Sequence, residues 1–134
     1  MDWKLVFKLS LFGLAMGLAT VFFIPPSIEP VFWLIIFLVC AYIIAKQRPA
    51  KHFLHGLFVG LVNSVGVTAS HIVFLGRYLD NHPREAAMMT SMPLSDSPRL
   101  MMALTGPVIG LISGLVIGIL SWVAARILKR PQPA

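Results

Sequence analysis

The stretch that decides the fold is LMMALTGPVIGLISGLVIGILSWVAA, residues 100–125, which carries no charge between Arg99 and Arg126. A helix needs roughly 20 apolar residues to cross the hydrocarbon core of a bilayer, and this stretch exceeds that length. Glycine recurs at every fourth position, at Gly106, Gly110, Gly114 and Gly118. Four residues turn a helix through about 400°, so these glycines form one groove that another helix can approach closely. The stretch therefore predicts a membrane helix with a glycine face.

Three more uncharged stretches precede it, at residues 9–28, 30–45 and 52–76. Pro25 and Pro26 would end the first, because proline breaks the helical hydrogen-bond ladder. We expect membrane helices at about 5–24, 30–46, 52–77 and 98–128. A short amphipathic helix is expected on the outer side at about 83–92, entered through Pro83. The chain, residues 1–134, is thus predicted to be a single membrane domain, an all-α integral membrane four-helix bundle.

The composition supports a membrane protein. Hydrophobic residues make up 57% of the 134 residues and charged residues only 12%, and the mean hydropathy is +0.84. Soluble domains carry about 25% charged residues, and a domain this small could not bury so much apolar surface. Cys40 is the single cysteine, so an intramolecular disulfide framework is excluded. Membrane lipids are therefore the expected surroundings of the chain.

Basic residues gather on one side of the predicted bundle. With four spans, both termini and the 46–51 loop share a side, which holds Lys4, Lys8, Lys46, Arg48, Lys51, Arg126, Lys129 and Arg130. Because basic residues concentrate in cytoplasmic loops, we expect an N-in, C-in orientation with residues 25–30 and 77–99 outside. The net charge of +6 then reports topology, and no nucleic-acid partner is expected.

The glycine spacing of the last helix returns in two others, at Gly13 and Gly17 and at Gly56 and Gly60. In lipid, helices associate mainly through close packing, so these rows are candidate packing faces. One interpretation is that they hold the four helices of one chain together. The other is that they form the seam of a homo-oligomer or a contact with other membrane subunits.

A stripe of polar and small residues follows the predicted helix 52–77. Its polar members are His52, Asn63, Ser70 and His71, on the same side as Gly56, whereas His55 lies off the stripe. Polar groups inside a membrane need partners, because hydrocarbon supplies none. The stripe is either a lined binding groove or pathway, or it supplies interhelical hydrogen bonds. The spans are expected to hold no carboxylate, which argues against a proton-coupled exporter.

The sequence contains no motif for catalysis or for a cofactor, so we expect a protein that is not an enzyme and has no cofactor. The four histidines are spread too far along the chain to predict haem ligation across helices. Met88, Met89, Met92 and His82 fall together in the 77–99 segment, and thioether and imidazole groups suit Cu(I). Methionine also fills irregular space at helix ends. We predict that the three methionines bury against the neighbouring helix ends and bind no metal.

The layout resembles a bacterial family of small four-helix membrane proteins that is known only as a domain of unknown function. The resemblance rests on the basic loop from Lys46 to Lys51 and on the Phe53-Leu54-His55-Gly56 start of the next helix. It continues through the methionine-rich segment Tyr78 to Met92 and the glycine-rich last helix. The resemblance implies a multi-pass protein of the bacterial inner membrane and implies no activity.

Two functions follow from these features. The first is a non-catalytic structural or accessory protein that forms complexes through its glycine-rich helix faces. The second is a small homo-oligomeric transporter or channel that uses the polar stripe, since four helices alone rarely enclose a pore. The bonding of Asn63 distinguishes them, because a fully bonded amide would favour the first.

Overall fold

The computed structural model describes residues 1–128, and Lys129 and Arg130 of the predicted basic side lie outside the described residues. Within these residues every regular secondary-structure element is a helix. Its helices are α1 (Trp3–Phe22), α2 (Glu29–Gln47), α3 (His52–Val73), α4 (Leu75–Asn81), α5 (Pro83–Ser91) and α6 (Pro98–Leu128). By length and apolar composition, α1, α2, α3 and α6 could each cross a membrane. The predicted all-α fold with four apolar helices is therefore confirmed.

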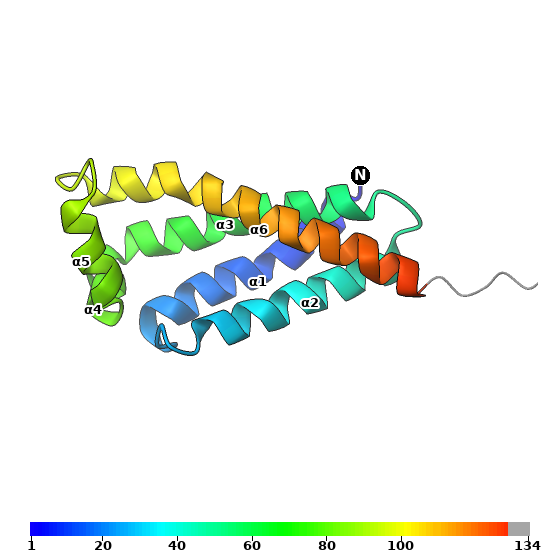
Figure 1. Ribbon diagram of the computed structural model, residues 1–134, viewed down its shortest axis with the longest axis horizontal. Coiled ribbons are helices and arrows are strands. Elements are labelled where there is room, and N and C mark those ends of the chain that lie inside the picture. The colour runs from blue at the N-terminus through cyan, green and yellow to red at the C-terminus, as the bar shows by residue number, and fades with distance from the viewer. Residues whose placement is uncertain (129–134) are drawn as a thin grey trace, which may run out of the picture.

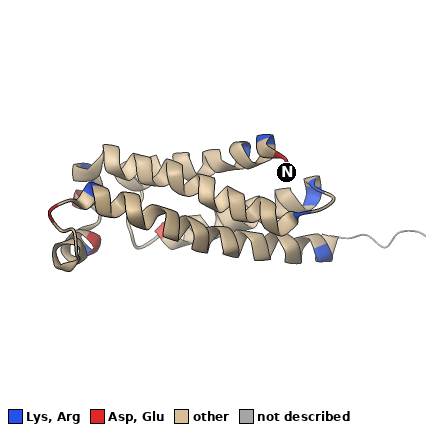
Figure 2. Ribbon diagram, turned by 90° about the horizontal axis from the view of Figure 1, so that it is seen from above, with Lys and Arg blue, Asp and Glu red and all other residues tan. Residues whose placement is uncertain are grey.

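The four long helices lie side by side along the long axis of the molecule (Figure 1). The N-terminus, the loop between α2 and α3 and the end of α6 lie together at what we call the terminal end. The short helices α4 and α5 lie at the opposite end, the α5 end (Figure 1). Charged residues gather near these two ends, and the helices between them are almost uncharged (Figure 2).

The terminal end is tied together by Asp2. Its carboxylate caps α1 by accepting a hydrogen bond from the Leu5 backbone N–H at 3.0 Å, and it pairs with Arg48 at 2.8 Å. The Asp2 backbone N–H donates to His55 Nε2 at 3.1 Å. His55 is buried although it lies off the predicted polar stripe. These contacts join the start of α1 to the loop that precedes α3.

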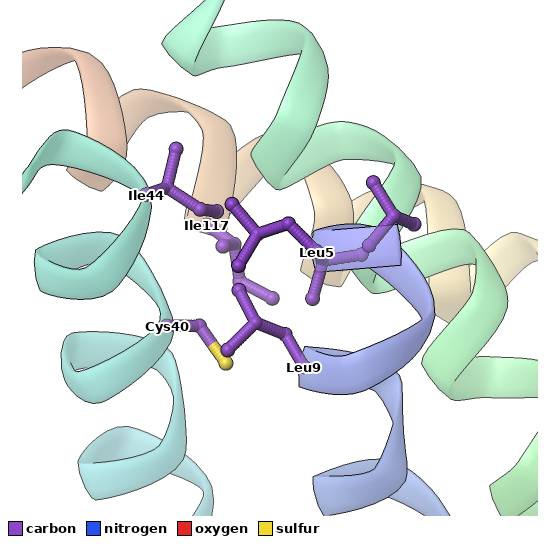
Figure 3. Close-up of a cluster of buried hydrophobic side chains, with 7 residues drawn as sticks. Leu5, Leu9, Cys40, Ile44 and Ile117 are labelled. Atoms are coloured by element: carbon purple, nitrogen blue, oxygen red, sulfur yellow. The ribbon is translucent and has the colours of Figure 1, made fainter. Parts of the chain in front are cut away.

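Helix α3 is the centre of the bundle and packs against both α1 and α6, while α2 packs mainly on α6. The short loop between α1 and α2 predicts that these helices are antiparallel neighbours. Their backbones nevertheless make little contact. They meet through side chains in the core cluster that Figure 3 shows, formed by Leu5, Val6, Leu9, Cys40, Ile44, Val59 and Ile117. This cluster lies toward the terminal end and leaves the α5 half of α2 free of it.

The predicted helix 52–77 is divided in two. Helix α3 ends at Val73, where Phe74 leaves helical geometry with φ −107° and ψ 38°, and α4 starts at Leu75. Phe74 itself is neither proline nor glycine, and the nearest glycine, Gly76, lies inside α4. The Phe74 ring packs edge-on against Phe22 of α1, with the ring centroids 5.0 Å apart. This contact between distant segments accompanies the break, which redirects the chain across the α5 end.

Candidate functional site

The glycine rows of α3 and α6 face each other. A Cβ atom added to Gly56 would lie 2.5 Å from the Gly118 nitrogen, and one added to Gly60 would collide with the Gly114 backbone. One added to Gly114 would collide with the Leu57 carbonyl oxygen. On this half of the bundle the two backbones therefore touch, and no side chain fits between them.

Gly118 meets the carbonyl oxygen and the ring of Phe53, and the other four predicted packing glycines meet polar side chains. Gly13 faces Asn63, Gly17 faces Ser70 and the Val67 backbone, Gly106 faces Thr68, and Gly110 faces Ser64. All eight predicted packing glycines thus lie at contacts inside a single chain, and all eight are buried. This arrangement matches the interpretation in which the rows hold the bundle together.

Beyond the glycine contact, α6, α3 and α2 line a half-open cavity of about 450 Å³ in the α5 half of the bundle. It is lined by Glu29, Trp33 and Phe37 of α2, by Gly60, Asn63, Ser64, Val67, Thr68 and His71 of α3, by Tyr78 of α4, by Glu85, Met88 and Met89 of α5 with Met92, and by Met101, Met102, Thr105, Gly106, Ile109, Gly110 and Ser113 of α6. Gly60 and His71 lie about 16 Å apart along a helix, which indicates the length of the cavity. Its volume falls in the range of roughly 300–1,000 Å³ that is usual for small-molecule sites.

Asn63 lies in the deep part of this cavity and is 4% exposed. Its Oδ1 accepts a hydrogen bond from the Gly13 backbone N–H at 3.2 Å. Its Nδ2 has no partner although the atom is buried. A buried donor without a partner costs about 1–3 kcal/mol. Only the oxygen of this amide is therefore satisfied, by α1.

Glu29 and His82 form a pair at the α5 end, with Nε2 and Oε2 3.0 Å apart and His82 only 1% exposed. The other ring nitrogen of His82 lies 2.9 Å from the Tyr78 carbonyl oxygen, which can only accept, so Nδ1 carries a proton. The Nε2 contact with the Glu29 carboxyl is an ion pair when the His82 ring is protonated.

Trp33 Nε1 donates to the other Glu29 oxygen at 3.2 Å, so both oxygens of this carboxyl are used. Glu29 is the first residue of α2, and one carboxylate thus belongs to an apolar helix, contrary to the expectation that the spans hold none. It lies at the helix end, where the N-terminal dipole favours a negative charge.

Tyr78 is stacked between two histidines. Its ring centroid lies 4.0 Å from that of His71 and 4.1 Å from that of His82. His71 Nε2 contacts Thr20 Oγ1 at 3.0 Å, and that hydroxyl donates to the Gly17 carbonyl, so His71 donates to Thr20. Burial, reinforced by Glu29 and Glu85, raises the pKa of Tyr78 to about 12, which keeps the phenol neutral. Both histidines engage Nε2 with protein groups, so the stack is a hydrogen-bonded structural unit.

Glu85 lines the cavity from α5, and its Oε2 is the second buried atom in residues 1–128 that lacks a hydrogen-bond partner. No Lys or Arg stands among the described lining residues. Both oxygens of Glu29 contact Trp33 or His82, whereas Glu85 Oε2 has no partner among the described residues. The two residues of this part of the chain with an unpartnered buried polar atom, Asn63 and Glu85, therefore both line the same cavity.

The methionines lie differently from the prediction. Met88 and Met92 are 58% and 42% exposed, so they do not bury against the helix ends. The reason is that α5 crosses the end of the bundle and packs chiefly on α4. Met101 and Met102 of α6 are buried and line the same cavity as Met88, Met89 and Met92. His82, the fourth residue of the copper hypothesis, is bonded to Glu29. Among residues 1–128 no group of three His, Cys, Asp or Glu residues could hold a metal.

The predicted polar stripe divides into two kinds of residue. Asn63 and His71 line the cavity, whereas His52 bonds the Arg48 carbonyl at 2.8 Å and Ser70 donates to the Gly66 carbonyl at 2.8 Å. The latter two are satisfied within their own segment. Sequence reasoning missed Glu29, Trp33 and Glu85 as site residues. Nothing in the local sequence links Glu29 to His82, which are 53 positions apart.

No protein-family model, curated protein or solved structure matches this chain. The resemblance to the uncharacterised bacterial family therefore stays a prediction, and the function is argued from the geometry of the site alone.

Proposed function

We propose that this chain is a non-catalytic integral membrane protein that binds a small, largely apolar molecule inside its helix bundle. The observation that carries the proposal is the cavity of about 450 Å³ whose lining residues include Asn63 and Glu85, each with a buried polar atom that lacks a hydrogen-bond partner. Ligand sites are typically apolar cavities with a few convergent polar groups, and buried polar atoms are rarely left unpaired without a reason.

The proposal differs from the accessory role expected from the sequence, in which the glycine-rich helix faces form complexes with other chains. Those rows lie at contacts within one chain, so they support a packing role inside the bundle. A homo-oligomer or a complex with other membrane subunits would use other surfaces. Helix α2 offers one such face, because it is the least buried of the four long helices and only Cys40, Ala41 and Ile44 are buried along it. We place the protein in the bacterial inner membrane, with both termini in the cytoplasm, because of its charge distribution.

Transport is the second candidate, and one observation favours it. The cavity ends at the contact between Gly60 and Gly114, so it is closed on the side of the terminal end. A cavity that is closed at one end is a feature of carriers that expose a site to each side in turn. Such a carrier would have to separate the α3 and α6 glycine faces during its cycle.

The binding proposal is tested by filling the cavity. Ser113 lines the cavity, whereas its neighbour Ile112 is 58% exposed on the outside of α6. Native mass spectrometry of protein taken into nanodiscs directly from the expressing membrane would detect a retained molecule. We expect it with the unmodified chain and with the control Ile112→Trp, and we expect its loss with Ser113→Trp. The same bound mass in all three proteins would contradict the proposal, as would no bound mass in the unmodified chain.

A further inference from the structure

The chemistry of the cavity points to a class of ligand, an inference that rests on the binding function proposed above. Asn63, in the deep part of the lining, has a donor without an acceptor, Nδ2. Glu85, at the α5 end, has an acceptor without a donor, Oε2. Between them the lining is mostly apolar, with the five methionines, Phe37 and Ile109. A complementary molecule carries an acceptor at one end, a donor at the other and an apolar body.

The charge of the donor follows from the electrostatics of the lining. Glu85 is the acidic residue with no basic partner among the described lining residues, whereas Glu29 lies 3.0 Å from His82 Nε2. A charged hydrogen bond to a carboxylate is about twice as strong as a neutral one. Methionine sulfurs are polarisable and adapt to apolar ligands of varied shape. A protonated amine with an apolar body fits these requirements better than an alcohol or an acid.

We propose that the cavity binds an amphipathic amine, with its ammonium group at Glu85 and an ester, ketone or ether oxygen at Asn63 Nδ2. The two polar ends hold the molecule along α3, and the methionines of α5 and α6 surround its apolar body. The amine can belong to a free molecule dissolved in the membrane or to the headgroup of an aminolipid. Both sources present the same ammonium group to Glu85.

The test uses the full chain in nanodiscs of phosphatidylcholine, with three tritiated probes measured by scintillation proximity. The probes are the methyl ester of ω-aminoundecanoic acid, the matching ω-hydroxy ester and the monomethyl ester of undecanedioic acid. Empty nanodiscs give the contribution of simple partitioning. We expect saturable binding of the amino ester, at least about tenfold tighter than that of the hydroxy ester.

The variant Glu85→Gln keeps the size of the side chain and removes its charge. We expect it to weaken binding of the amino ester about tenfold and to leave the hydroxy ester unchanged. The matched control is Asp80→Asn, an exposed acidic residue of α4 that does not line the cavity. At the deep end, undecylamine, which lacks the ester, should bind several-fold more weakly than the amino ester. That difference should vanish in Asn63→Leu while binding of undecylamine itself persists, which shows that this variant is folded.

The outcomes separate the two proposals. Equal binding of the amino and hydroxy esters, or tightest binding of the acid ester, would overturn the amine assignment and keep a binding cavity. Saturable binding of none of the probes would overturn both. A second set of nanodiscs, made of phosphatidylethanolamine, separates the sources of the amine. Weaker probe binding there assigns the site to an aminolipid headgroup, and unchanged binding assigns it to a free amine, and either result supports the amine site.

Discussion

Asn63 illustrates how one polar residue serves both the fold and the site. Its oxygen is bonded to the Gly13 N–H of α1, and the close fit is possible only because Gly13 has no side chain. A Cβ atom on Gly13 would lie 2.6 Å from that oxygen. The sequence predicts that the stripe on α3 is either a ligand groove or a source of interhelical bonds. Asn63 supplies one interhelical bond and also lines the cavity.

The pairing of Gly13 with Asn63 makes a prediction at the residue scale. Gly13→Ala should destabilise the bundle by about 1–3 kcal/mol, because the new methyl group overlaps the amide. Asn63→Ala removes the interhelical bond and should cost roughly 0.6–1.7 kcal/mol. The double variant should be more stable than the sum of the two effects implies, since the smaller residue 63 makes room for the methyl group. Equilibrium unfolding in mixed micelles measures all three, and strict additivity would contradict the contact.

At the scale of elements, α3 and α6 associate through backbone contact rather than through interlocking side chains. Where the atom opposite a glycine belongs to a flexible side chain, a substitution can be absorbed. Opposite Gly114 it is the carbonyl oxygen of Leu57, and opposite Gly60 it is the Gly114 backbone. The two helices must then move apart, which would expose the end of the cavity.

We therefore expect Gly114→Leu to be more disruptive than substitution of a glycine that faces a side chain. The cost should reach or exceed the upper end of the about 1–3 kcal/mol that overpacking usually costs. Ala103→Leu is the matched control, because Ala103 lies on the exposed side of α6 and its enlargement should change little. Thermal melting in detergent with yield of folded protein provides the comparison. Equal melting of Gly114→Leu and the unmodified chain would show that this face is not in contact.

The start of α1 depends on the charge of Asp2. Its bond to the Leu5 N–H, supported by Arg48 and His55, keeps the pKa of this carboxyl below its ordinary value of 3.8. Because the pKa of Asp2 is lower in the folded state, the stabilising effect of its charge is fully present above the ordinary value of 3.8. It is lost as the pH falls through the folded-state pKa.

Amide hydrogen exchange at Leu5 tests this cap. Protection should decline on acidification below the ordinary aspartate value of 3.8. Asp2→Asn retains a capping oxygen and should remove most of that pH dependence. Asp2→Ala should leave Leu5 weakly protected at every pH. Protection in Asp2→Ala equal to that of the unmodified chain would show that the cap does not hold the helix start.

At the scale of the whole molecule, the two ends differ in charge. Lys4, Lys8, Lys46, Arg48, Lys51 and Arg126 belong to the terminal end, where Asp2 is the acidic residue within the described part of the chain. The other end holds Arg77, Arg84 and Arg99 beside Glu29, Asp80, Glu85 and Asp96. The ends also differ in structure, since a compact core cluster lies toward the first and the cavity toward the second.

This asymmetry predicts that both termini face the cytoplasm and that the cavity lies toward the outer leaflet. A C-terminal green fluorescent protein should fluoresce, and a C-terminal alkaline phosphatase, which folds only outside the cytoplasm, should be inactive. Phosphatase fused after Asn81 should be active and serves as the positive control. An active phosphatase at the C-terminus would reverse the orientation and place the cavity toward the cytoplasm.

The sequence by itself determined the parts of this protein that depend on neighbouring residues. Long uncharged stretches predict α1, α2, α3 and α6. The recurrence of glycine at every fourth residue from Gly106 to Gly118 predicts a close-packed face. Each of these signals lies within one continuous segment. Pro83 likewise predicts where α5 begins. These features need no knowledge of what lies opposite each helix.

Only the tertiary structure decided which glycine row meets which, where the long third helix breaks and what the cavity contains. Phe74 ends α3 beside Phe22 from another helix. Glu29 meets His82 across 53 positions, and the two α6 methionines join those of the α5 segment around one space. Such contacts depend on the rotation and separation of whole helices, which packing among distant residues sets. The pairing of polar groups, and hence the candidate site, therefore emerges only when the bundle has formed.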